Sequence, residues 1–210
     1  MIVGVCGLIG SGKDTVADYL CTFHGFKRLS FAESLKDAVS AIFGWDRDLL
    51  EGSTKSSREW REQVDIWWSE RLNIPQLTPR YVLQYWGTEV ARNNFHNDIW
   101  VASVENKLRN TKDNIVITDC RFRNEVSAIK NSNGIVIRVE RGQRPEWYEF
   151  AEQYNKGPNQ IGWAIAKNEL MKLDIHASEY SSIGLDYDYV IENNNTIDEL
   201  HQQINSIINL

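Results

Sequence analysis

The sequence predicts an α/β fold in which a five-stranded parallel sheet is flanked by helices, and three observations support this prediction. Short apolar runs rich in β-branched residues alternate along the chain with segments of helical spacing, which is the order that builds parallel strands with helical crossovers. The first such run is followed directly by a glycine-rich turn and a helix. No repeat or low-complexity segment interrupts the alternation. We therefore expect right-handed strand–helix–strand connections.

The first strand, turn and helix carry the most specific motif of the chain. Residues 2–6 form a short apolar run, residues 7–15 read GLIGSGKDT, and residues 14–23 have helical apolar spacing. This order is the setting of a phosphate-binding loop, or P-loop. Glycines let backbone N–H groups converge on phosphate oxygens, and a helix N-terminus adds partial positive charge. Lys13 can reach the β- and γ-phosphates. The motif predicts a P-loop NTPase with a nucleoside triphosphate site; the alternative is a glycine-rich turn without a ligand.

One position departs from the usual G-x-x-x-x-G-K-S/T pattern. Asp14 occupies the position of the magnesium-binding hydroxyl, and Thr15 follows it. Nucleoside monophosphate kinases are similar at this point, since they also lack that hydroxyl and carry a threonine one position later.

Composition limits the class of protein. The chain has 210 residues, of which 42% are hydrophobic and 25% charged, as expected for one globular domain, here 1–210. The net charge of -6 argues against nucleic-acid binding but does not exclude a small phosphorylated substrate. Three cysteines without metal spacing fit a reducing cytosol. The chain begins with a strand and has no apolar run near about 18 residues, so we expect a cytoplasmic protein without a membrane segment.

The remaining elements follow in chain order. Further strands are expected at 26–31, 114–118, 134–140 and 187–192, and helices at 34–43, from Pro79 onwards, at 98–108, up to Ile129, and from Thr196 to Leu210. Thr78 is a predicted N-cap because proline follows it at the first helical position. Thr196 and Glu199 fit a capping box.

Two segments stand outside this alternation. Residues 45–75 are polar and tryptophan-rich, and we interpret them as a helical excursion that covers the substrate side of the site; a plain surface hairpin is the alternative. Residues 141–178 are predicted to form a lid-like insertion. Its helical pattern follows Arg138, Arg141 and Arg144, and a closing lid would expel water and bring arginines to the charge that develops at transfer. The alternative is a surface arginine cluster, and no role is assigned to His176.

Candidate acceptor-side residues lie on two predicted helices. Arg80, Gln84 and Thr88 recur every four residues and therefore share a helix face that suits a phosphate and a base edge. Gly87 in the helix interior costs about 1 kcal/mol relative to alanine, which suggests a close approach. Lys36 lies in the first turn of its helix, where a cation opposes the dipole. For each of these, an ordinary solvated helix face remains the alternative.

Polar residues also follow the strand at 114–118. Ligands of parallel sheets gather beyond the carboxyl ends of the strands, which places Asp119 to hold Mg²⁺ through water and Arg121 to meet the transferred phosphate. Glu125 follows about one helical turn later. The alternative makes Asp119 an N-cap with Glu125 as its capping partner. Asn193, at the end of the last strand, could touch adenine, although turn chemistry also explains it.

With these motifs in place, the chain resembles the phage-type deoxynucleoside monophosphate kinases. The resemblance lies in GLIGSGKDT with the following VAD, FAESLKDA, PRYVLQYWGTEVARNNF with DIWV, VITDCRFRNE, HASE and DYVIENNNTIDEL. It implies a nucleoside monophosphate kinase-like P-loop fold. It also implies transfer of the γ-phosphoryl group of ATP to a deoxynucleoside monophosphate, with Mg²⁺, for DNA precursor synthesis in the host cytoplasm if the protein is phage-encoded.

The resemblance and the spacing together give the expected site. ATP would be bound by Gly10, Ser11, Gly12, Lys13, Asp14, Thr15, Arg141 and Asn193. The acceptor would be bound by Lys36, Arg80, Gln84, Gly87, Thr88, Trp100, Asp119 and Glu125. Lys13, Arg121, Asp119 and Arg80 would act in catalysis, and Thr15 and Asp119 would hold the metal, the latter through water.

Other functions were weighed against this one. Another small-molecule P-loop kinase, acting on dephospho-coenzyme A or phosphomevalonate, would share the first block but lack PRYVLQYWGTE and RFRNE. A non-catalytic nucleotide switch would need no acceptor face. The sequence leaves open which bases are accepted, the selectivity for deoxyribose, and whether a homodimer forms.

Overall fold

The computed structural model describes residues 1–173, 175 and 177–209, and these divide into two compact units. Unit 1 consists of Met1–Ser30 and Lys107–Leu210, and unit 2 of Phe31–Asn106. Within the described residues, no helix is long and apolar enough to cross a membrane. Because His176 lies outside the described residues, the HASE segment is not described as a whole.

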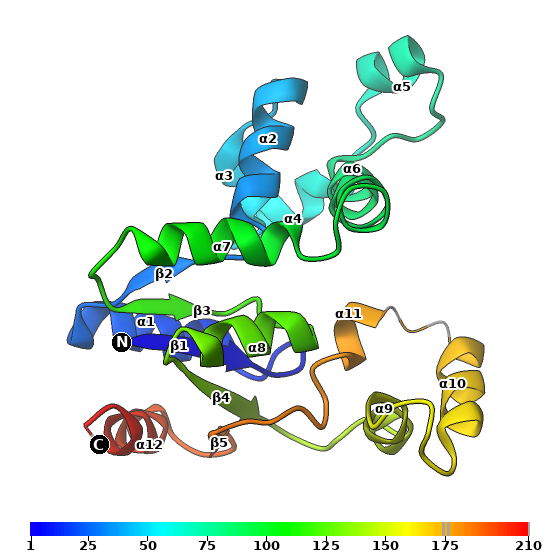
Figure 1. The fold of residues 1–210 in the computed structure, drawn as a ribbon. Helices are drawn as coiled ribbons and strands as arrows, with labels where there is room; N and C mark the ends of the chain where they lie inside the picture. The colour runs from blue at the N-terminus through cyan, green and yellow to red at the C-terminus, as the bar shows by residue number, and fades with distance from the viewer. Residues whose placement is uncertain (174, 176, 210) are drawn as a thin grey trace. The chain divides into compact units, whose positions relative to one another are not determined.

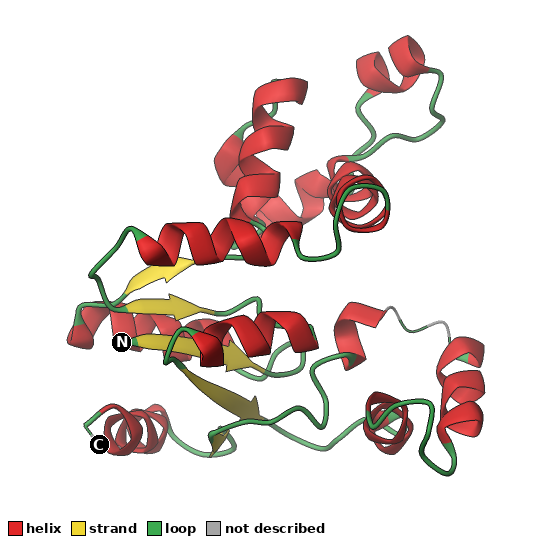
Figure 2. Ribbon diagram, viewed as in Figure 1, coloured by secondary structure: helices red, strands yellow, loops and turns green. Residues whose placement is uncertain are grey.

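Unit 1 contains a five-stranded parallel sheet, as the sequence predicted (Figures 1 and 2). Its strands are β1 (Ile2–Cys6), β2 (Lys27–Leu29), β3 (Ile115–Ile117), β4 (Ile135–Glu140) and β5 (Tyr189–Glu192), in the order β2-β3-β1-β4-β5. Val3 of β1 pairs with Val116 on one side and Ile135 on the other. The central strands are buried on both faces, which explains their continuous β-branched runs.

Helices cover this sheet. α1 (Lys13–His24), α8 (Arg123–Asn131) and α12 (Ile197–Ile208) belong to unit 1, and α7 (Ile99–Arg109) runs from unit 2 into unit 1. Val16 and Leu20 of α1 share a buried core with Leu200 and Ile204 of α12. Thr196 accepts a hydrogen bond from the backbone N–H of Glu199 at 3.3 Å and caps α12 as predicted.

The predicted insertion after β4 is helical where the structure describes it. It contains α9 (Tyr148–Asn155), α10 (Trp163–Lys172) and α11 (Ala177–Tyr180). The interruption between α9 and α10 includes Gly157 in the left-handed region, at φ 100, where the sequence indicated a break.

Unit 2 is entirely helical in its described elements. These are α2 (Glu33–Phe43), α3 (Arg47–Glu51), α4 (Lys55–Arg61), α5 (Ile66–Leu72), α6 (Pro79–Tyr85) and a π-helix, η1 (Trp86–Asn93). Its core combines Leu35, Val39 and Phe43 of α2 with Val82 of α6. The tryptophan-rich segment supplies part of this core, since the Phe43 and Trp45 rings stack with centroids 4.4 Å apart.

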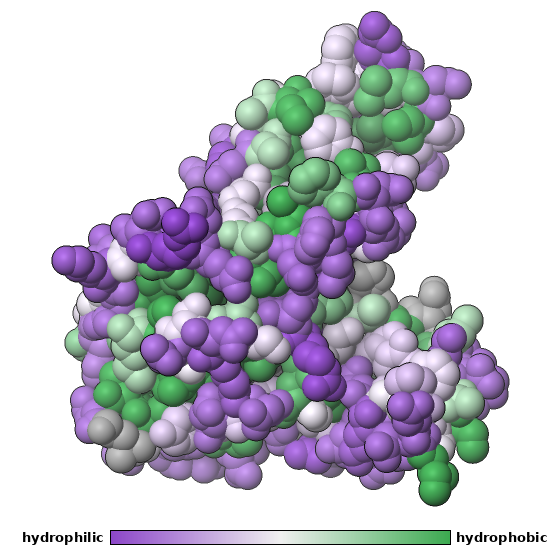
Figure 3. All heavy atoms as spheres, in the orientation of Figure 1, coloured by the Kyte–Doolittle hydropathy of each residue, from purple (hydrophilic) through white to green (hydrophobic). Residues whose placement is uncertain are grey.

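The surface of the protein is mixed. Figure 3 shows mainly hydrophilic residues on the face that it presents, with hydrophobic residues interspersed. This agrees with the ordinary charged content of the chain, 25%. Many of the large apolar side chains are buried in the core.

Candidate functional site

The glycine-rich turn after β1 has the backbone geometry that a phosphate cradle needs. Gly10 and Gly12 have φ values of 79 and 101, in the left-handed region that residues with a Cβ rarely adopt. Gly12 is the N-cap of α1, so the first N–H groups of the helix are presented at the turn. The backbone N–H of Ser11 donates to the carbonyl of Leu8 at 3.2 Å and closes the loop.

Lys13 folds back across this loop. Its ammonium group donates to the carbonyl oxygens of Gly7 at 2.9 Å and Leu8 at 2.8 Å. Burial lowers the pKa of Lys13, and the positive charge of Arg121 lowers it further. The structure therefore brings two predicted catalytic cations together. An anionic phosphate oxygen is a stronger acceptor for the ammonium group than these neutral carbonyls are.

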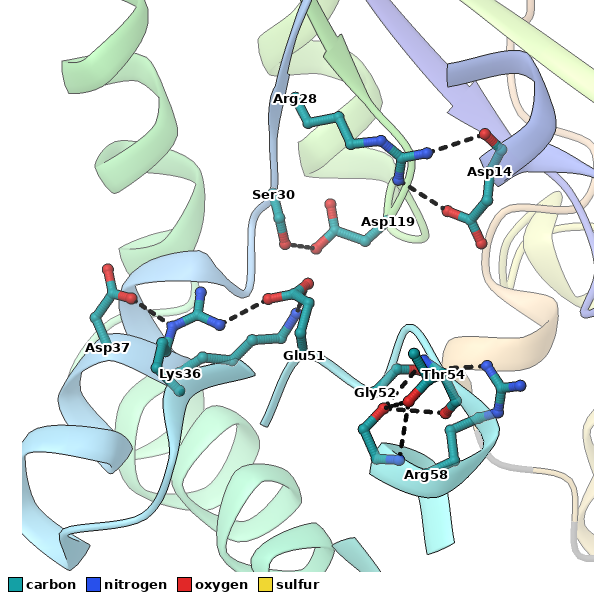
Figure 4. A network of polar contacts seen from close by, with 12 residues as sticks. Asp14, Arg28, Ser30, Lys36, Asp37, Glu51, Gly52, Thr54, Arg58 and Asp119 are labelled. Carbon is teal, nitrogen blue, oxygen red and sulfur yellow. Dashed lines mark hydrogen bonds and ion pairs between the residues drawn. The ribbon is translucent and has the colours of Figure 1, made fainter. Parts of the chain in front are cut away.

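The side chain of Asp14 is directed to a different partner. Its carboxylate accepts a hydrogen bond from Arg28 on β2 at 3.1 Å (Figure 4). Arg28 also donates to Asp18 at 2.8 Å. The contribution of Asp14 to a phosphate cradle is thus limited to its backbone N–H. Thr15 is half-buried in the first turn of α1.

Asp119 lies just beyond β3, at the carboxyl edge of the sheet. The hydroxyl of Ser30, which follows the neighbouring strand β2, donates to Asp119 Oδ2 at 2.6 Å (Figure 4). Asp119 is not the N-cap of α8, because that helix begins at Arg123 with Phe122 in the cap position. That part of the structural alternative is wrong, and a role for Asp119 at a metal or acceptor stays a prediction.

Glu125 has a clear structural function. It is only 2% exposed, and its Oε2 accepts the backbone N–H groups of Arg121 at 2.7 Å and Phe122 at 3.0 Å. It therefore caps α8, as the structural alternative had it, and fixes the backbone that carries Arg121. The guanidinium of Arg121 is half-exposed and lies 3.4 Å from a carboxylate oxygen of Glu179 on α11.

A cavity of about 210 Å³ adjoins the phosphate loop within unit 1. It is lined by Leu8, Ser11, Arg138, Val139, Glu140, Arg141, Gly142, Gln143, Arg144, Tyr148, Glu192 and Asn194. The hydroxyl of Ser11 is buried, and no hydrogen-bond partner for it exists among the described residues. A polar atom in this state indicates a missing partner, such as a ligand or water.

Two asparagines after β5 connect the walls of this cavity. The Asn193 side-chain amide donates to the carbonyl of Ser11 at 2.9 Å, and a Cβ on Gly12 would lie 2.3 Å from the same nitrogen. Asn194 accepts the N–H of Gly142 at 2.7 Å. Asn193 thus contacts the phosphate loop itself, and its predicted contact with adenine remains untested.

Arg138 is buried, so the alternative of a surface arginine cluster is wrong for this residue. It is 2% exposed, and its guanidinium lies 5.4 Å and 5.3 Å from the ring centroids of Tyr148 and Tyr187. It donates to Glu140 at 2.9 Å, and Arg144 approaches the same carboxylate at 3.0 Å. Because β4 is a central strand with both faces covered, a side chain at position 138 points into packed structure. Of the three arginines, Arg141 and Arg144 are exposed.

Burial and charge shift several pKa values in this network. Burial acts to raise the pKa of Glu140, but hydrogen bonds from Arg138 and Arg144 outweigh it and the pKa is lowered. Burial raises the pKa of Tyr187 to about 12, so this phenol stays protonated and donates or accepts hydrogen bonds as a neutral group.

In unit 2, the two predicted phosphate-binding cations are paired with carboxylates. Lys36 donates to Glu51 at 2.6 Å, and Arg47 contacts the other oxygen of Glu51 at 2.7 Å (Figure 4). Arg80 donates through Nε to Glu62 at 2.7 Å. The Lys36 side chain is only 12% exposed, so the alternative of an ordinary solvated lysine is wrong, and binding of the acceptor by Lys36 stays a prediction.

The predicted long helix from Pro79 changes its winding at Trp86, where α6 passes into η1. A π-turn contains more residues than an α-turn, so the four-residue spacing does not keep Thr88 on the face of Gln84. Both side chains are exposed. The indole N–H of Trp100 donates to the carbonyl of Gly87 at 2.9 Å. A Cβ on Gly87 would lie 2.9 Å from Leu35, so the close approach inferred from this glycine is to α2.

Sequence reasoning missed several partners of these residues. Four residues that the sequence did not single out bond the predicted residues: Arg28, Ser30, Glu51 and Glu140. The first three lie on different elements from their partners. Glu140 lies on a strand that was assigned to the core. Only the adjacency of β2 and β3 could have indicated the contact between Ser30 and Asp119.

Comparison with known proteins agrees with the resemblance. The family described as deoxynucleotide monophosphate kinase matches residues 49–151. A protein of Acanthamoeba polyphaga mimivirus named "Putative deoxynucleotide monophosphate kinase" is 29% identical over 223 residues, which cover 99% of this chain and 96% of that protein. The deoxynucleoside-5'-monophosphate kinase of Escherichia phage T5 is 28% identical over 182 residues, covering 63% of this chain and 73% of that protein.

Solved structures give a weaker likeness. A shikimate kinase from Aquifex aeolicus covers 100% of this chain and 96% of its own, with 13% identity and a TM-score of 0.48, and this says nothing about the substrate. Both sequence relatives, by contrast, are named as deoxynucleotide or deoxynucleoside monophosphate kinases, and the family match covers residues 49–151. By sequence, the chain is therefore similar to deoxynucleotide monophosphate kinases.

Proposed function

We propose that this protein transfers the γ-phosphoryl group of ATP to a deoxynucleoside monophosphate, giving ADP and a deoxynucleoside diphosphate for DNA precursor synthesis. The observation that carries the proposal is the glycine-rich turn at the N-terminus of α1, where Lys13 bonds the carbonyls of Gly7 and Leu8 and the positive charge of Arg121 contributes to lowering its pKa. Two cations whose charges oppose one another are stabilised by an anion between them. A transferring phosphoryl group is such an anion.

In the proposed reaction, an oxygen of the acceptor phosphate attacks the γ-phosphorus of ATP. The bond from the γ-phosphorus to the β–γ bridging oxygen breaks, and ADP leaves with that electron pair. The attacking phosphate is already anionic, so no strong general base is required. Lys13 and Arg121 neutralise the charge that develops on the transferred group. Arg80 and Lys36 bind and orient the acceptor phosphate for in-line attack.

The residues near the phosphate loop fit Mg²⁺. No group of three His, Cys, Asp or Glu side chains able to hold a metal exists among the described residues. Mg²⁺ in phosphoryl-transfer sites needs only one or two protein oxygens, because waters and substrate phosphates supply the rest. Asp119 would hold Mg²⁺ through water, with Thr15 as the second oxygen donor, because carboxylate and hydroxyl oxygens are suitable acceptors for metal-bound water and for the metal. Bound there, Mg²⁺ would neutralise charge on the phosphate oxygens of ATP.

The base of ATP is proposed to occupy the cavity beside the phosphate loop. Two observations support this: Arg141 and Ser11 both line the cavity, and the buried Ser11 hydroxyl has no hydrogen-bond partner among the described residues. Asn193 would act on ATP by holding the Ser11 carbonyl and so fixing the loop. The segment 141–178 would close over the phosphates as a lid and exclude water.

Selectivity for the acceptor is proposed to come from unit 2. Gln84 and Thr88 would read the base edge, with Asp119 and Glu125 completing the acceptor side. Trp100, held by its bond to Gly87, and Trp86 would fill the space that a 2′-hydroxyl needs. Equal turnover of ribo- and deoxyribonucleotides would remove this part of the proposal.

A coupled assay of ADP release tests the function. The four deoxynucleoside monophosphates and their ribo forms are supplied with ATP and Mg²⁺, and the product is identified by chromatography. We expect release of ADP that depends on at least one deoxynucleotide, with the matching diphosphate as product. ATP turnover that no nucleoside monophosphate changes would contradict the proposal and favour a nucleotide switch.

A further inference from the structure

Glu179, on α11, is a carboxylate at the phosphate site to which no motif assigned a role. Its Oε1 lies 3.4 Å from Nη1 of Arg121. The backbone of Arg121 is fixed, because its N–H donates to Glu125 at 2.7 Å, but its side chain is 45% exposed. A long exposed side chain keeps many rotamers unless a partner selects one. A guanidinium has several N–H donors, so a contact through Nη1 orients the group without using all of them.

The charge of Glu179 acts on both cations of the phosphate site. Burial lowers the pKa of Lys13, and the charge of Arg121 lowers it further. The negative charges of Asp14 and Glu179 act in the opposite direction. The Asp14 carboxylate is bonded by Arg28, whereas that of Glu179 faces Arg121. Glu179 therefore lies within electrostatic range of both Lys13 and Arg121.

α11 is anchored within the insertion that follows β4, so the carboxylate has a defined place. The ring of Tyr180 meets that of Tyr154 on α9 edge-on, with centroids 5.6 Å apart. The Asn155 side-chain amide donates to the carbonyl of Tyr180 at 2.7 Å. Leu8 of the phosphate loop packs against the same hydrophobic cluster as these two tyrosines. The carboxylate is thus carried by packed structure that also contacts the phosphate loop, as precise positioning requires.

Neither stability nor ligand binding explains a carboxylate at this point. The two side chains of the ion pair are 45% and 30% exposed, and such a pair contributes little to the free energy of unfolding. A negative charge beside a phosphate site also repels the anionic phosphates. Orientation of a group at the reacting atoms is a sufficient reason, because a small misplacement there lowers the rate severely.

We propose that Glu179 is a positioning residue for phosphoryl transfer, whose carboxylate holds the guanidinium of Arg121 in place beside the phosphate loop. This inference rests on the proposed function, since it takes Arg121 as the residue that meets the transferred phosphoryl group. Glu179 exchanges no proton and does not touch the substrate; it acts through Arg121. Loss of its charge therefore slows transfer, while ATP loses a repulsive neighbour.

Steady-state ADP release, calorimetry and denaturant unfolding of the whole protein test the proposal together. Glu179→Gln keeps the shape of the side chain and removes its charge, and Glu179→Asp keeps the charge on a shorter side chain. Glu179→Gln is also combined with Arg121→Met, and single turnover with excess enzyme measures the slow variants. Glu169→Gln is the matched control, because Glu169 lies on α10 of the same insertion, pairs with Lys172 at 2.6 Å and has a similar exposure of 33%.

We expect Glu179→Gln to lower kcat by about 10-fold, as for a misaligned group at the reacting atoms. Its affinity for a non-hydrolysable ATP analogue should stay the same or rise by up to about 3-fold, because a like charge is removed. In the Arg121→Met background the same substitution should change kcat by less than about 2-fold, since the group that it positions is absent. The kcat of Glu179→Asp should lie above that of Glu179→Gln. Glu169→Gln should match the wild type, and all single variants should unfold as the wild type does.

Wild-type kcat in Glu179→Gln would overturn the proposal. A fall in kcat that persists in the Arg121→Met background would also overturn it, because Glu179 would then act independently of Arg121. Failure of Glu179→Gln to fold, or a kcat of Glu179→Asp no higher than that of Glu179→Gln, would assign the side chain a structural role instead. Failure of the function is a different result. A wild type without monophosphate-dependent ADP release refutes the kinase and the positioning role with it, whereas unchanged turnover in Glu179→Gln refutes the positioning role alone.

Discussion

The two units of the molecule prepare for an anion in different ways. In unit 1, the phosphate loop depends on backbone geometry, because left-handed glycines and the first N–H groups of α1 lie together in one continuous segment, residues 7–15. In unit 2, the candidate groups are the Lys36 and Arg80 side chains on α2 and α6, which contact carboxylates of the same unit. Backbone N–H groups need no counter-ion, whereas clustered arginines do.

This difference explains why the phosphate loop of unit 1 is easier to recognise in the sequence than the candidate anion-binding groups of unit 2. A cradle of backbone groups must be local in sequence, so it leaves a motif. A side-chain cluster draws on segments separated by many residues, so its pattern is scattered. We expect variants in unit 1 to affect transfer most strongly, and variants of the charge networks to affect stability and pH dependence.

The largest effect is expected from Arg121→Ala. A guanidinium at the transferred phosphoryl group contributes about 10³- to 10⁵-fold in rate, so kcat should fall by about 10³-fold or more. Steady-state measurement of ADP release provides the value. Arg109→Ala, at an exposed arginine on α7, is the control, and a fall in kcat of less than 10-fold for Arg121→Ala would place this arginine outside the reaction.

Lys13→Ala should have the next largest effect. Removal of one preorganised donor at developing charge costs about 10²- to 10³-fold, and kcat/KM for ATP should fall by that factor. Because Lys13 bonds only neutral carbonyls of its own loop among the described residues, the unfolding free energy should change little. Near wild-type kcat/KM in a folded variant would show that the loop does not bind the donor phosphates.

Arg138→Met tests the buried network of unit 1 and should act on stability. The substitution removes the bonds from Arg138 to Glu140 and Tyr187, and hydrogen bonds to charged groups are worth about 1.5–3 kcal/mol. Denaturant titration should show that the free energy of unfolding falls by about 2 kcal/mol. The decrease is limited because Arg144 still pairs with Glu140. An unchanged unfolding free energy would mean that packing of the methionine replaces the ion pair completely.

The smallest effect concerns pH. For Glu51, burial acts to raise the pKa, but hydrogen bonds from Lys36 and Arg47 lower it below its ordinary value of 4.5. The folded state then binds fewer protons than the unfolded state below that value, so this stabilisation is complete above about pH 5 and is lost as pH falls. The effect should stay near 1 kcal/mol because the pair is partly exposed.

Unfolding measured from pH 7 to pH 3 checks this prediction. Glu51→Gln should be less stable than the wild type at pH 7 and should show a shallower loss below pH 4.5, the ordinary pKa of this carboxyl group. Glu140→Gln is the matching variant in unit 1, where Arg138 and Arg144 lower the pKa of the carboxylate. If the free energy of unfolding depends on pH in the same way for Glu51→Gln and the wild type, Glu51 has the same pKa in the folded and unfolded states, and the prediction is wrong.

The sheet and most helices could be predicted from the sequence because their signals are local. The β-branched runs, the Thr78 and Thr196 caps and the glycines after α1 and α2 all mark the elements that the structure contains. The phosphate loop was recognisable for the same reason. The π-helix at Trp86 was not, because the same apolar stripe suits α and π winding and only contacts from α2 and Trp100 decide between them.

Side-chain pairing was the part that the sequence did not show. Arg138 lay within an arginine-rich stretch, yet strand alternation directs it into a buried site between two tyrosines. The bonds from Lys36 to Glu51 and from Ser30 to Asp119 join elements whose closeness depends on tertiary packing. The sequence offered a capping function for Glu125 only as the alternative to acceptor binding, and it named the wrong partner, Asp119. The observed partners, Arg121 and Phe122, lie four and three residues away.

The most direct test of the account is to measure donor and acceptor affinity separately in Lys13→Ala and Arg80→Ala. Calorimetry with a non-hydrolysable ATP analogue and with deoxynucleoside monophosphates gives four dissociation constants to compare with the wild type. The account predicts a crossed pattern, in which Lys13→Ala weakens the ATP analogue at least 10-fold and Arg80→Ala weakens the monophosphate at least 10-fold, each leaving the other ligand within 3-fold. Equal weakening of both ligands by either variant, or no binding of any monophosphate to the wild type, would contradict it.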